Sequence, residues 1–322
     1  SRHLGGGGAP AARASRGPRA QMDGVLARLK EEDRQTRKDA LKELPKVVPQ
    51  GDAAAIAQAV EAVTPQLEDA NGSVRRVAVD VLKELAPKGH QDVVAKLIAR
   101  IKDPSRDVRT VAVRALAKVA EKGDGVAISN VVQCLENEKA HERQAALLAL
   151  AHITTRGDEA TVTRVVAALE DSHGIVRQAA LEAIPALVVK GSATAVAAAV
   201  ARLQDPNQDV RKAAVEVLGK ITDRGDEQAI KAVTSCLRNT DGAVRQATMQ
   251  ALEKVADRGD ERAIGAVLAE LAHENGQVRW AAVWALAQVA NRNNQGAIEA
   301  LTKCLEDKDC SKAASEVLRL LQ

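Results

Sequence analysis

The sequence predicts an all-α protein, an α-solenoid of about nine two-helix repeats with a 34-residue period. Three observations support this prediction. An arginine with similar neighbours returns at a fixed interval, apolar residues around it recur with helical spacing, and a glycine follows each apolar run. The composition agrees, because the chain is rich in the helix-favouring residues Ala, Leu, Glu, Lys and Arg and contains two Trp and no Phe or Tyr.

One arginine marks the same place in most repeats. The marking arginines are Arg37, Arg75, Arg109, Arg143, Arg177, Arg211, Arg245 and Arg279. From Arg75 onward they are 34 residues apart, whereas Arg37 lies 38 residues before Arg75, which indicates one short insertion. A ninth copy ends the chain, with Ser311 in place of the arginine. Self-similarity at such a period is typical of stacked helical repeats.

Apolar residues on both sides of the arginine indicate two helices per repeat. A Leu or Ile stands eight residues before and seven residues after each marking arginine. In the second helix, helix B, the apolar residues Val210, Ala214, Val215, Leu218 and Ile221 fall on one face. One helix pair cannot bury that face alone, so the repeats are expected to stack and to share a continuous core.

A glycine fourteen residues after the arginine is expected to end helix B in the left-handed conformation. These glycines are Gly51, Gly89, Gly123, Gly157, Gly191, Gly225 and Gly259. The residue that follows is an aspartate at Asp52, Asp124, Asp158, Asp226 and Asp260, and it is expected to cap the first helix, helix A, of the next repeat. The Arg-Gly-Asp tripeptides at 156–158, 224–226 and 258–260 are such junctions, with a cation at a helix end, rather than adhesion motifs.

Two prolines fall inside predicted B helices. Pro45 and Pro185 both stand eight residues after a marking arginine. Because proline lacks the backbone N–H and its ring clashes with the preceding turn, we expect both helices to be kinked or irregular.

The N-terminal segment differs in composition from the repeats. Residues 1–21 are rich in Arg, Gly and Ala and contain no acidic residue, which predicts a disordered tail and fits the remnant of an organelle transit peptide. Residues 22–322 are expected to form a single solenoid. That part of the chain is close to neutral, because four arginines of the tail exceed the formal net charge of +3.

The net charge and the positions of the cysteines indicate which partners and which cellular compartment to expect. Nucleic-acid binding needs concentrated Lys and Arg, and a membrane span needs about 18 apolar residues, so we expect neither. Cys134, Cys236 and Cys304 share one helix A position in distant repeats and cannot pair, and only Cys304 and Cys310 could approach each other. Reduced thiols predict an intracellular protein, cytoplasmic or, if the tail is a transit-peptide remnant, plastid or mitochondrial.

Residues 22–322 resemble HEAT repeats, including the variety found in phycobilisome-lyase-like proteins. The string Asp-Pro-x-x-x-Val-Arg-x-Ala-Ala/Val-x-x-x-Leu carries the resemblance and is seen almost whole from Asp205 to Leu218 and from Asp103 to Leu116. A tetratricopeptide repeat has a similar length but needs aromatic residues in each copy. The resemblance implies that helix B lines a concave surface, and that an acidic residue six before the arginine forms a ladder with the arginines. That position reads Asp69, Asp103, Asn137, Asp171, Asp205, Asn239 and His273, so the ladder degrades in three repeats.

The candidate binding site is the departure from the repeat in its eighth copy. Trp280 and Trp284 stand one and five residues after Arg279, at positions that are mostly polar in the other repeats. Two adjacent indoles on a polar face are typical of a protein interface, although they could instead pack against the ninth repeat. The predicted partner-binding residues are Trp280, Trp284, Gln246, Gln250, Gln288 and Leu148.

An enzyme built on the same repeat is the alternative. Deoxyhypusine-hydroxylase-like proteins hold a di-iron centre through His-Glu pairs, and this chain has His141-Glu142 and His273-Glu274. Neither pair is in the register that such a centre requires, and the two lie four repeats apart. A bilin-lyase-like enzyme is the other form of this alternative. The sequence therefore predicts a non-catalytic protein-binding scaffold, with no catalytic residue, no metal site and no cofactor.

Overall fold

A computed structural model describes residues 17–322 of the chain. Most of the predicted disordered tail, residues 1–21, lies outside the described residues, so the tail and its transit-peptide interpretation stay predictions. The first helix, α1 (Pro18–Arg28), begins ahead of the predicted boundary at residue 22. Proline suits the first turn of a helix, because its φ is already helical and its missing N–H would have had no partner there.

The described chain is all-α, with eighteen α-helices and six short 3-10 helices, and residues 17–322 contain no strand. Contacts divide the chain into two compact units, Ser1–Ala120 and Glu121–Gln322. The first unit contains α1, α2 (Arg34–Val47), α3 (Ala53–Val63), η1 (Thr64–Glu68), α4 (Gly72–Leu85), α5 (Gln91–Ala99), η2 (Arg100–Lys102) and α6 (Arg106–Val119). The second contains α7 (Gly125–Gln133), η3 (Cys134–Glu136), α8 (Ala140–Ile153), α9 (Glu159–Ala167), η4 (Ala168–Glu170), α10 (Gly174–Leu187), α11 (Ala193–Ala201), η5 (Arg202–Gln204), α12 (Gln208–Ile221), α13 (Glu227–Ser235), η6 (Cys236–Arg238), α14 (Gly242–Val255), α15 (Glu261–Glu270), α16 (Gly276–Val289), α17 (Gln295–Cys304) and α18 (Ser311–Leu321).

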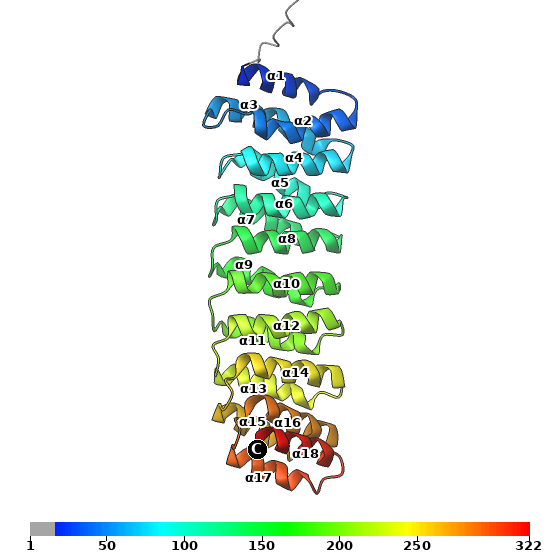
Figure 1. The fold of residues 1–322 in the computed structure, drawn as a ribbon, viewed down its shortest axis with the longest axis vertical. Helices are drawn as coiled ribbons and strands as arrows, with labels where there is room; N and C mark the ends of the chain where they lie inside the picture. Colours follow the sequence, from blue (N-terminus) through cyan, green and yellow to red (C-terminus); the bar gives the residue numbers. More distant parts are fainter. Residues whose placement is uncertain (1–16) are drawn as a thin grey trace, which may run out of the picture. The chain divides into compact units, whose positions relative to one another are not determined.

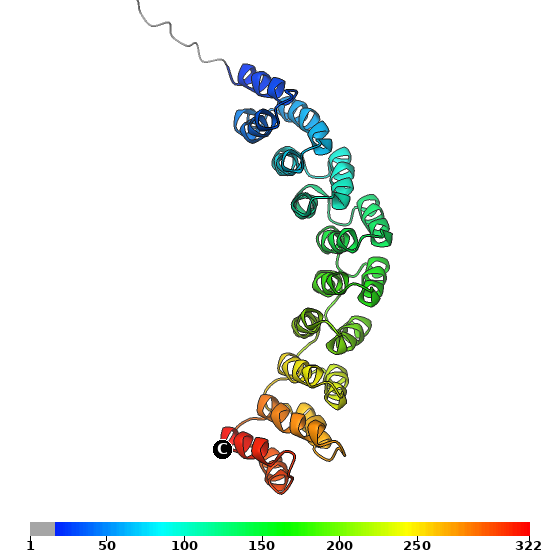
Figure 2. The ribbon, with the colours of Figure 1, turned by 90° about the vertical axis from the view of Figure 1, so that its right-hand side faces the viewer.

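The helices of each unit lie in two layers, which are seen face-on in Figure 1 and edge-on in Figure 2. The even-numbered helices are the predicted helices B, and each packs against the next even-numbered helix, from α2 to α6 in the first unit and from α8 to α18 in the second. The odd-numbered helices are the helices A and form the other layer. The predicted helix-pair α-solenoid is confirmed for both units, whereas a single solenoid over residues 22–322 stays a prediction.

The core lies between the two layers and is built from Ala, Val, Leu and Ile. In α12 the predicted apolar stripe is buried in full, from Val210 through Val215 and Leu218 to Ile221. Full burial of such a side chain contributes roughly 1.5–3 kcal/mol relative to leaving it in water. The positions three, seven and ten residues after the marking arginine, or after Ser311 in α18, are buried in every B helix of the second unit, so each repeat is held mainly by its neighbours.

The repeat glycines are left-handed as predicted, but they do not end the B helices. Their φ angles lie between +78° and +89°. Helix α6, however, ends at Val119, ahead of Gly123, and the residue after it is extended. From Gly89 onward, the glycine N–H instead donates to the last carbonyl of the next B helix, as from Gly123 to Ile153 (2.7 Å) and from Gly259 to Val289 (2.6 Å). The glycine thus fixes the spacing of successive repeats, and Asn293 (φ 61°) plays the same part toward Leu321.

The arginines of the Arg-Gly-Asp junctions also serve the following repeat. Arg156 donates to the carbonyl of Pro185 (3.0 Å), and Arg258 donates to the carbonyls of Ala287 (2.7 Å) and Ala290 (3.0 Å). Each cation therefore stabilises the negative end of the next B helix rather than of its own, which corrects the predicted placement. The aspartates cap the A helices as predicted, as Asp158 accepts from the Thr161 N–H (2.8 Å).

The two prolines do not interrupt their helices, and the predicted kink at Pro45 and Pro185 stays a prediction. Helices α2 and α10 run through Pro45 and Pro185 and are 14 residues long, the same length as α12 and α16, which lack proline. Both prolines lie in the last turn of their helix. Proline removes one internal hydrogen bond there, and each helix continues for two further residues to its usual length.

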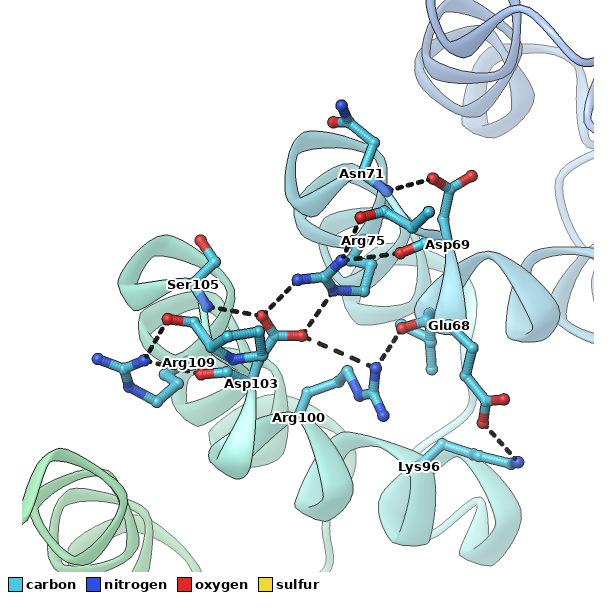
Figure 3. Close-up of polar contacts among 12 residues, drawn as sticks. Glu68, Asp69, Asn71, Arg75, Lys96, Arg100, Asp103, Ser105 and Arg109 are labelled. Carbon is cyan, nitrogen blue, oxygen red and sulfur yellow. Dashed lines mark hydrogen bonds and ion pairs between the residues drawn. The ribbon is translucent and has the colours of Figure 1, made fainter. Parts of the chain in front are cut away.

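The arginine–aspartate ladder is confirmed and joins successive B helices within each unit. In the first unit Arg75 donates to both carboxylate oxygens of Asp103 (2.7 and 2.8 Å) and to the carbonyl of Asp69 (2.8 Å), as Figure 3 shows. Burial alone raises the pKa of Asp103, but hydrogen bonds from Arg75 and from the Ser105 N–H outweigh it, so its pKa lies below the ordinary value. Equivalent pairs are Arg37–Asp69, Arg143–Asp171, Arg177–Asp205 and Arg279–Asp307.

Three rungs lack the carboxylate, at Asn137, Asn239 and His273, and the last of them leaves its arginine incompletely bonded. His273 stands where aspartate is usual, and its Nδ1 accepts the Asn275 N–H (3.0 Å), as an aspartate oxygen does elsewhere. No atom of the His273 ring replaces the second carboxylate oxygen, which would accept a hydrogen bond from Arg245. The Nε atom of Arg245 is buried without a hydrogen-bond partner, and Nη2 makes only a 3.3 Å contact with Gln277. The sequence predicts this defect, because the aspartate is absent from the repeat.

Candidate functional site

The two tryptophans lie on α16, on the side of the helix that its core residues leave free. Asn275 caps the helix by accepting the Gln277 N–H (2.8 Å). Ala281, Ala282 and Val283 are among the α16 residues buried against the neighbouring helices. The register that buries them brings Trp280 and Trp284 together, with ring centroids 6.2 Å apart and planes tilted by 59°. A tilted pair at this distance is a favourable arrangement of aromatic rings.

The two indoles differ in exposure. Trp280 is 37% exposed, which makes it one of the few large apolar side chains of residues 17–322 that face solvent. Trp284 is half-buried, and its Nε1 is buried without a hydrogen-bond partner among the described residues. A buried unpaired donor costs about 1–3 kcal/mol. Trp280 is therefore the more accessible ring, and the less exposed ring of Trp284 packs against it.

The structure brings most of the other predicted site residues close to this pair. Gln246 and Gln250 are exposed on α14, which packs against α16, and Gln288 is exposed on α16 itself. Leu148 is half-buried on α8. Helices α10, α12 and α14 lie between α8 and α16 in the layer, so Leu148 lies away from the tryptophan pair.

Leu320 is a candidate that the sequence analysis missed. It is 52% exposed on α18, the helix that packs on the other side of α16. It stands nine residues after Ser311, as Gln288 does after Arg279, so it occupies the same position of the repeat. The sequence identifies Leu320 as a candidate only once the imperfect ninth copy is aligned with the other repeats.

Within the described residues, the two His-Glu pairs of the enzyme alternative do not join a cluster of metal ligands. Residues 17–322 contain no group of three or more His, Cys, Asp or Glu arranged to hold a metal ion. Glu142 of the first His-Glu pair is bound by Lys139 (3.2 Å), and His273 of the second accepts the Asn275 N–H. Both pairs thus have structural contacts.

The four cysteines are buried, and none of them forms a disulfide within the described residues. Burial raises the pKa of the Cys304 thiol, and burial together with the Asp307 carboxylate raises that of Cys310 to about 12. The thiol of Cys310 lies 3.9 Å from the carbonyl oxygen of Cys304, so the two residues approach each other as expected. Protonated, buried thiols are poor nucleophiles.

Among the described residues 17–322, no helix combines the length and the apolar character that crossing a bilayer requires.

Comparisons with known proteins agree with this geometry. A family model for HEAT repeats matches residues 22–117, 60–151, 94–185, 162–253 and 249–321. No curated protein matches the chain. Among solved structures, an engineered protein is 20% identical with a TM-score of 0.40, covering 93% of this chain and 88% of its own. The YibA protein of Escherichia coli is 18% identical with a TM-score of 0.43, covering 85% of this chain and 97% of its own. Neither likeness bears on function at these scores, whereas the repeat model spans nearly all described residues: the chain belongs to the HEAT-repeat proteins.

Proposed function

We propose that the chain is a non-catalytic scaffold that binds another protein through the B-helix face, with Trp280 and Trp284 at the centre of the contact. We define the B-helix face as the side chains one, five and nine residues after each marking arginine. HEAT repeats typically serve as such scaffolds, and the part of the chain that is described holds no cluster of metal ligands.

The observation that carries the proposal is an exposed indole at a polar position of the repeat. The equivalents of Trp280 in the other repeats are Lys38, Arg76, Thr110, Gln144, Gln178, Lys212 and Gln246. Trp280 is nevertheless 37% exposed and is held by a second ring. Trp is among the commonest residues at interface hot spots, because a rigid ring buries a large area at little entropic cost.

The neighbours of the indole pair favour an uncharged segment of the partner. Gln246, Gln250 and Gln288 offer amide donors and acceptors, and Leu320 adds apolar area. Such a surface suits an apolar side chain of the partner on the rings, flanked by backbone groups that the glutamines bind.

The test is affinity capture from an extract of the chain's own cells with the full chain. We expect the Trp280→Ala/Trp284→Ala variant to lose a partner protein that the wild type retains, with an affinity loss of roughly thirtyfold or more. The control is Ile175→Ala/Val189→Ala, which removes two exposed apolar side chains of the same unit away from the B-helix face. Equal capture by all three chains, with thermal stability unchanged, contradicts the proposal.

A further inference from the structure

The B-helix face of the first unit differs in charge from that of the second. On α2 its three positions are Lys38, Lys42 and Lys46, and on α6 they are Thr110, Arg114 and Lys118. On α4, which lies between these helices, they are Arg76, Asp80 and Glu84. The face thus presents a block of cations, a mainly acidic row and a second block of cations.

Most of these cations are not neutralised by the chain itself. Lys46, Arg114 and Lys118 are exposed and, within the described residues, form no hydrogen bond or ion pair. Lys38 is half-buried and also has none. Lys42 reaches Asp39 only at 3.9 Å, with both side chains about half exposed.

Of the two acidic groups on this face, Asp80 is engaged locally, whereas Glu84 is exposed and forms no ion pair among the described residues. Asp80 accepts from Lys83 (2.9 Å) and lies 3.9 Å from Arg76. Glu43, on the same helix as Lys42, is bound by Arg28. The positive potential over α2 and α6 is therefore left for a binding partner.

We propose that the B-helix face of the first unit binds an acidic polypeptide segment whose charges are arranged as acidic, basic, acidic. Neighbouring helices pack about 10 Å apart, and an extended chain rises about 3.3 Å per residue. A segment crossing from α2 to α6 therefore carries its two acidic clusters about six residues apart, with a basic residue between them over Glu84, the acidic group of α4 that the chain leaves unpaired.

A polypeptide fits this face better than a nucleic acid does. A phosphate backbone carries the same charge at every step and meets Asp80 and Glu84 in the middle of the surface. Residues 1–120 contain no Phe, Tyr or Trp, so the first unit has no ring on which a base could stack. Only a polymer whose charge changes along its length is complementary to all three helices.

The site is independent of the tryptophan pair proposed above. On the B-helix face of the second unit, Glu182 and Glu216 accompany Lys212 and Lys220, and Glu216 is bound by Lys254 (3.4 Å). The charge of that face is balanced, and its distinctive feature is apolar. The chain thus offers two faces of different chemistry, one in each unit.

The test measures binding of fluorescein-labelled synthetic peptides to the full chain by anisotropy. The patterned peptide is Glu-Asp-Glu-Gly-Lys-Gly-Glu-Asp-Glu, and its isomer Glu-Asp-Glu-Glu-Asp-Glu-Gly-Lys-Gly has the same composition with contiguous acids. We expect the patterned peptide to bind several-fold more tightly than the isomer and to weaken with salt. We expect Lys42→Glu/Lys118→Glu to bind it about tenfold more weakly or worse.

Matched variants keep the result specific. Lys30→Glu/Lys102→Glu makes the same charge change at exposed residues outside this face and should bind the peptide within about twofold of the wild type. Trp280→Ala/Trp284→Ala should also bind it unchanged, which separates this proposal from the previous one. An equal loss in the Lys30/Lys102 variant, equal binding of the two isomers, or tighter binding of a labelled oligothymidylate than of the patterned peptide would overturn the proposal.

Discussion

At the scale of single residues, a repeat that departs from the common sequence pattern can be compared directly with the repeats that keep it. The ladder position holds aspartate at Asp69, Asp103, Asp171 and Asp205, and each accepts an arginine of the preceding repeat. At His273 the same backbone N–H is satisfied, but the guanidinium of Arg245 is not. One substitution therefore isolates the contribution of a single rung.

We predict that His273→Asp stabilises the protein. The new carboxylate has an acceptor oxygen for the Asn275 N–H and a second for Arg245 Nε, which is now buried without a partner. A charge-assisted hydrogen bond of this kind contributes about 1.5–3 kcal/mol. The measurement is the free energy of unfolding in urea. His273→Asn, which keeps one acceptor and adds no charge, is the control. A His273→Asp chain no more stable than the Asn variant contradicts the account of the ladder.

The ladder also predicts a loss of stability in acid. The pKa values of Asp103, Asp171 and Asp205 are lowered in the folded state: burial opposes this, and arginine and backbone N–H hydrogen bonds outweigh it. Carboxylates with lowered pKa stabilise the fold above their unfolded pKa of about 3.8, and this contribution is lost as the pH falls below that value. We expect denaturation curves to show a smaller loss of stability on acidification in Asp103→Asn than in the wild type. Parallel curves for the two chains would be inconsistent with this assignment.

At the scale of elements, the junction glycine has a role that spans two repeats. Its left-handed φ follows from the sequence, since only Gly or Asn adopts that conformation at little cost. The hydrogen-bond partner of the junction glycine does not follow from the sequence. The acceptor of Gly123 is Ile153, the last residue of the next B helix, and no local pattern marks a bond over that separation. Helix periodicity likewise predicted where α2 and α10 lie, but not that both helices continue past a proline in their last turn.

Two glycine substitutions separate the left-handed junction from ordinary helix. Neither Gly191 nor Gly265 has an atom within 4 Å of an added Cβ, but Gly191 has a φ of +83° and Gly265 lies inside α15. We predict that Gly191→Ala destabilises the fold by about 1 kcal/mol or more, whereas Gly265→Ala stabilises it by about 0.5–1 kcal/mol. Thermal unfolding followed by circular dichroism measures both changes. Opposite signs are required, and two changes of the same sign would refute the junction model.

At the scale of the whole molecule, periodicity predicts much more of the fold than of the site. The 34-residue beat locates both helices of each repeat, the arginine ladder and the polar positions of helix B. The period identifies Trp280 and Trp284 because these aromatic residues stand at repeat positions that are mostly polar in the other copies. It does not reveal that Trp284 is half-buried, because burial depends on how α14 and α18 flank α16. The charge pattern on the B-helix face of the first unit does not follow from the net charge, because net charge averages over faces.

The central claim is that Trp280 is an accessible anchor on the B-helix face. Acrylamide quenching of intrinsic fluorescence in Trp284→Phe, where Trp280 is the only remaining tryptophan, tests it most directly. The account predicts red-shifted emission that acrylamide quenches strongly, with Trp280→Phe giving bluer and better protected emission from Trp284. Blue-shifted, protected emission from Trp280 in the free chain would place the ring in the core and contradict the assignment of the site.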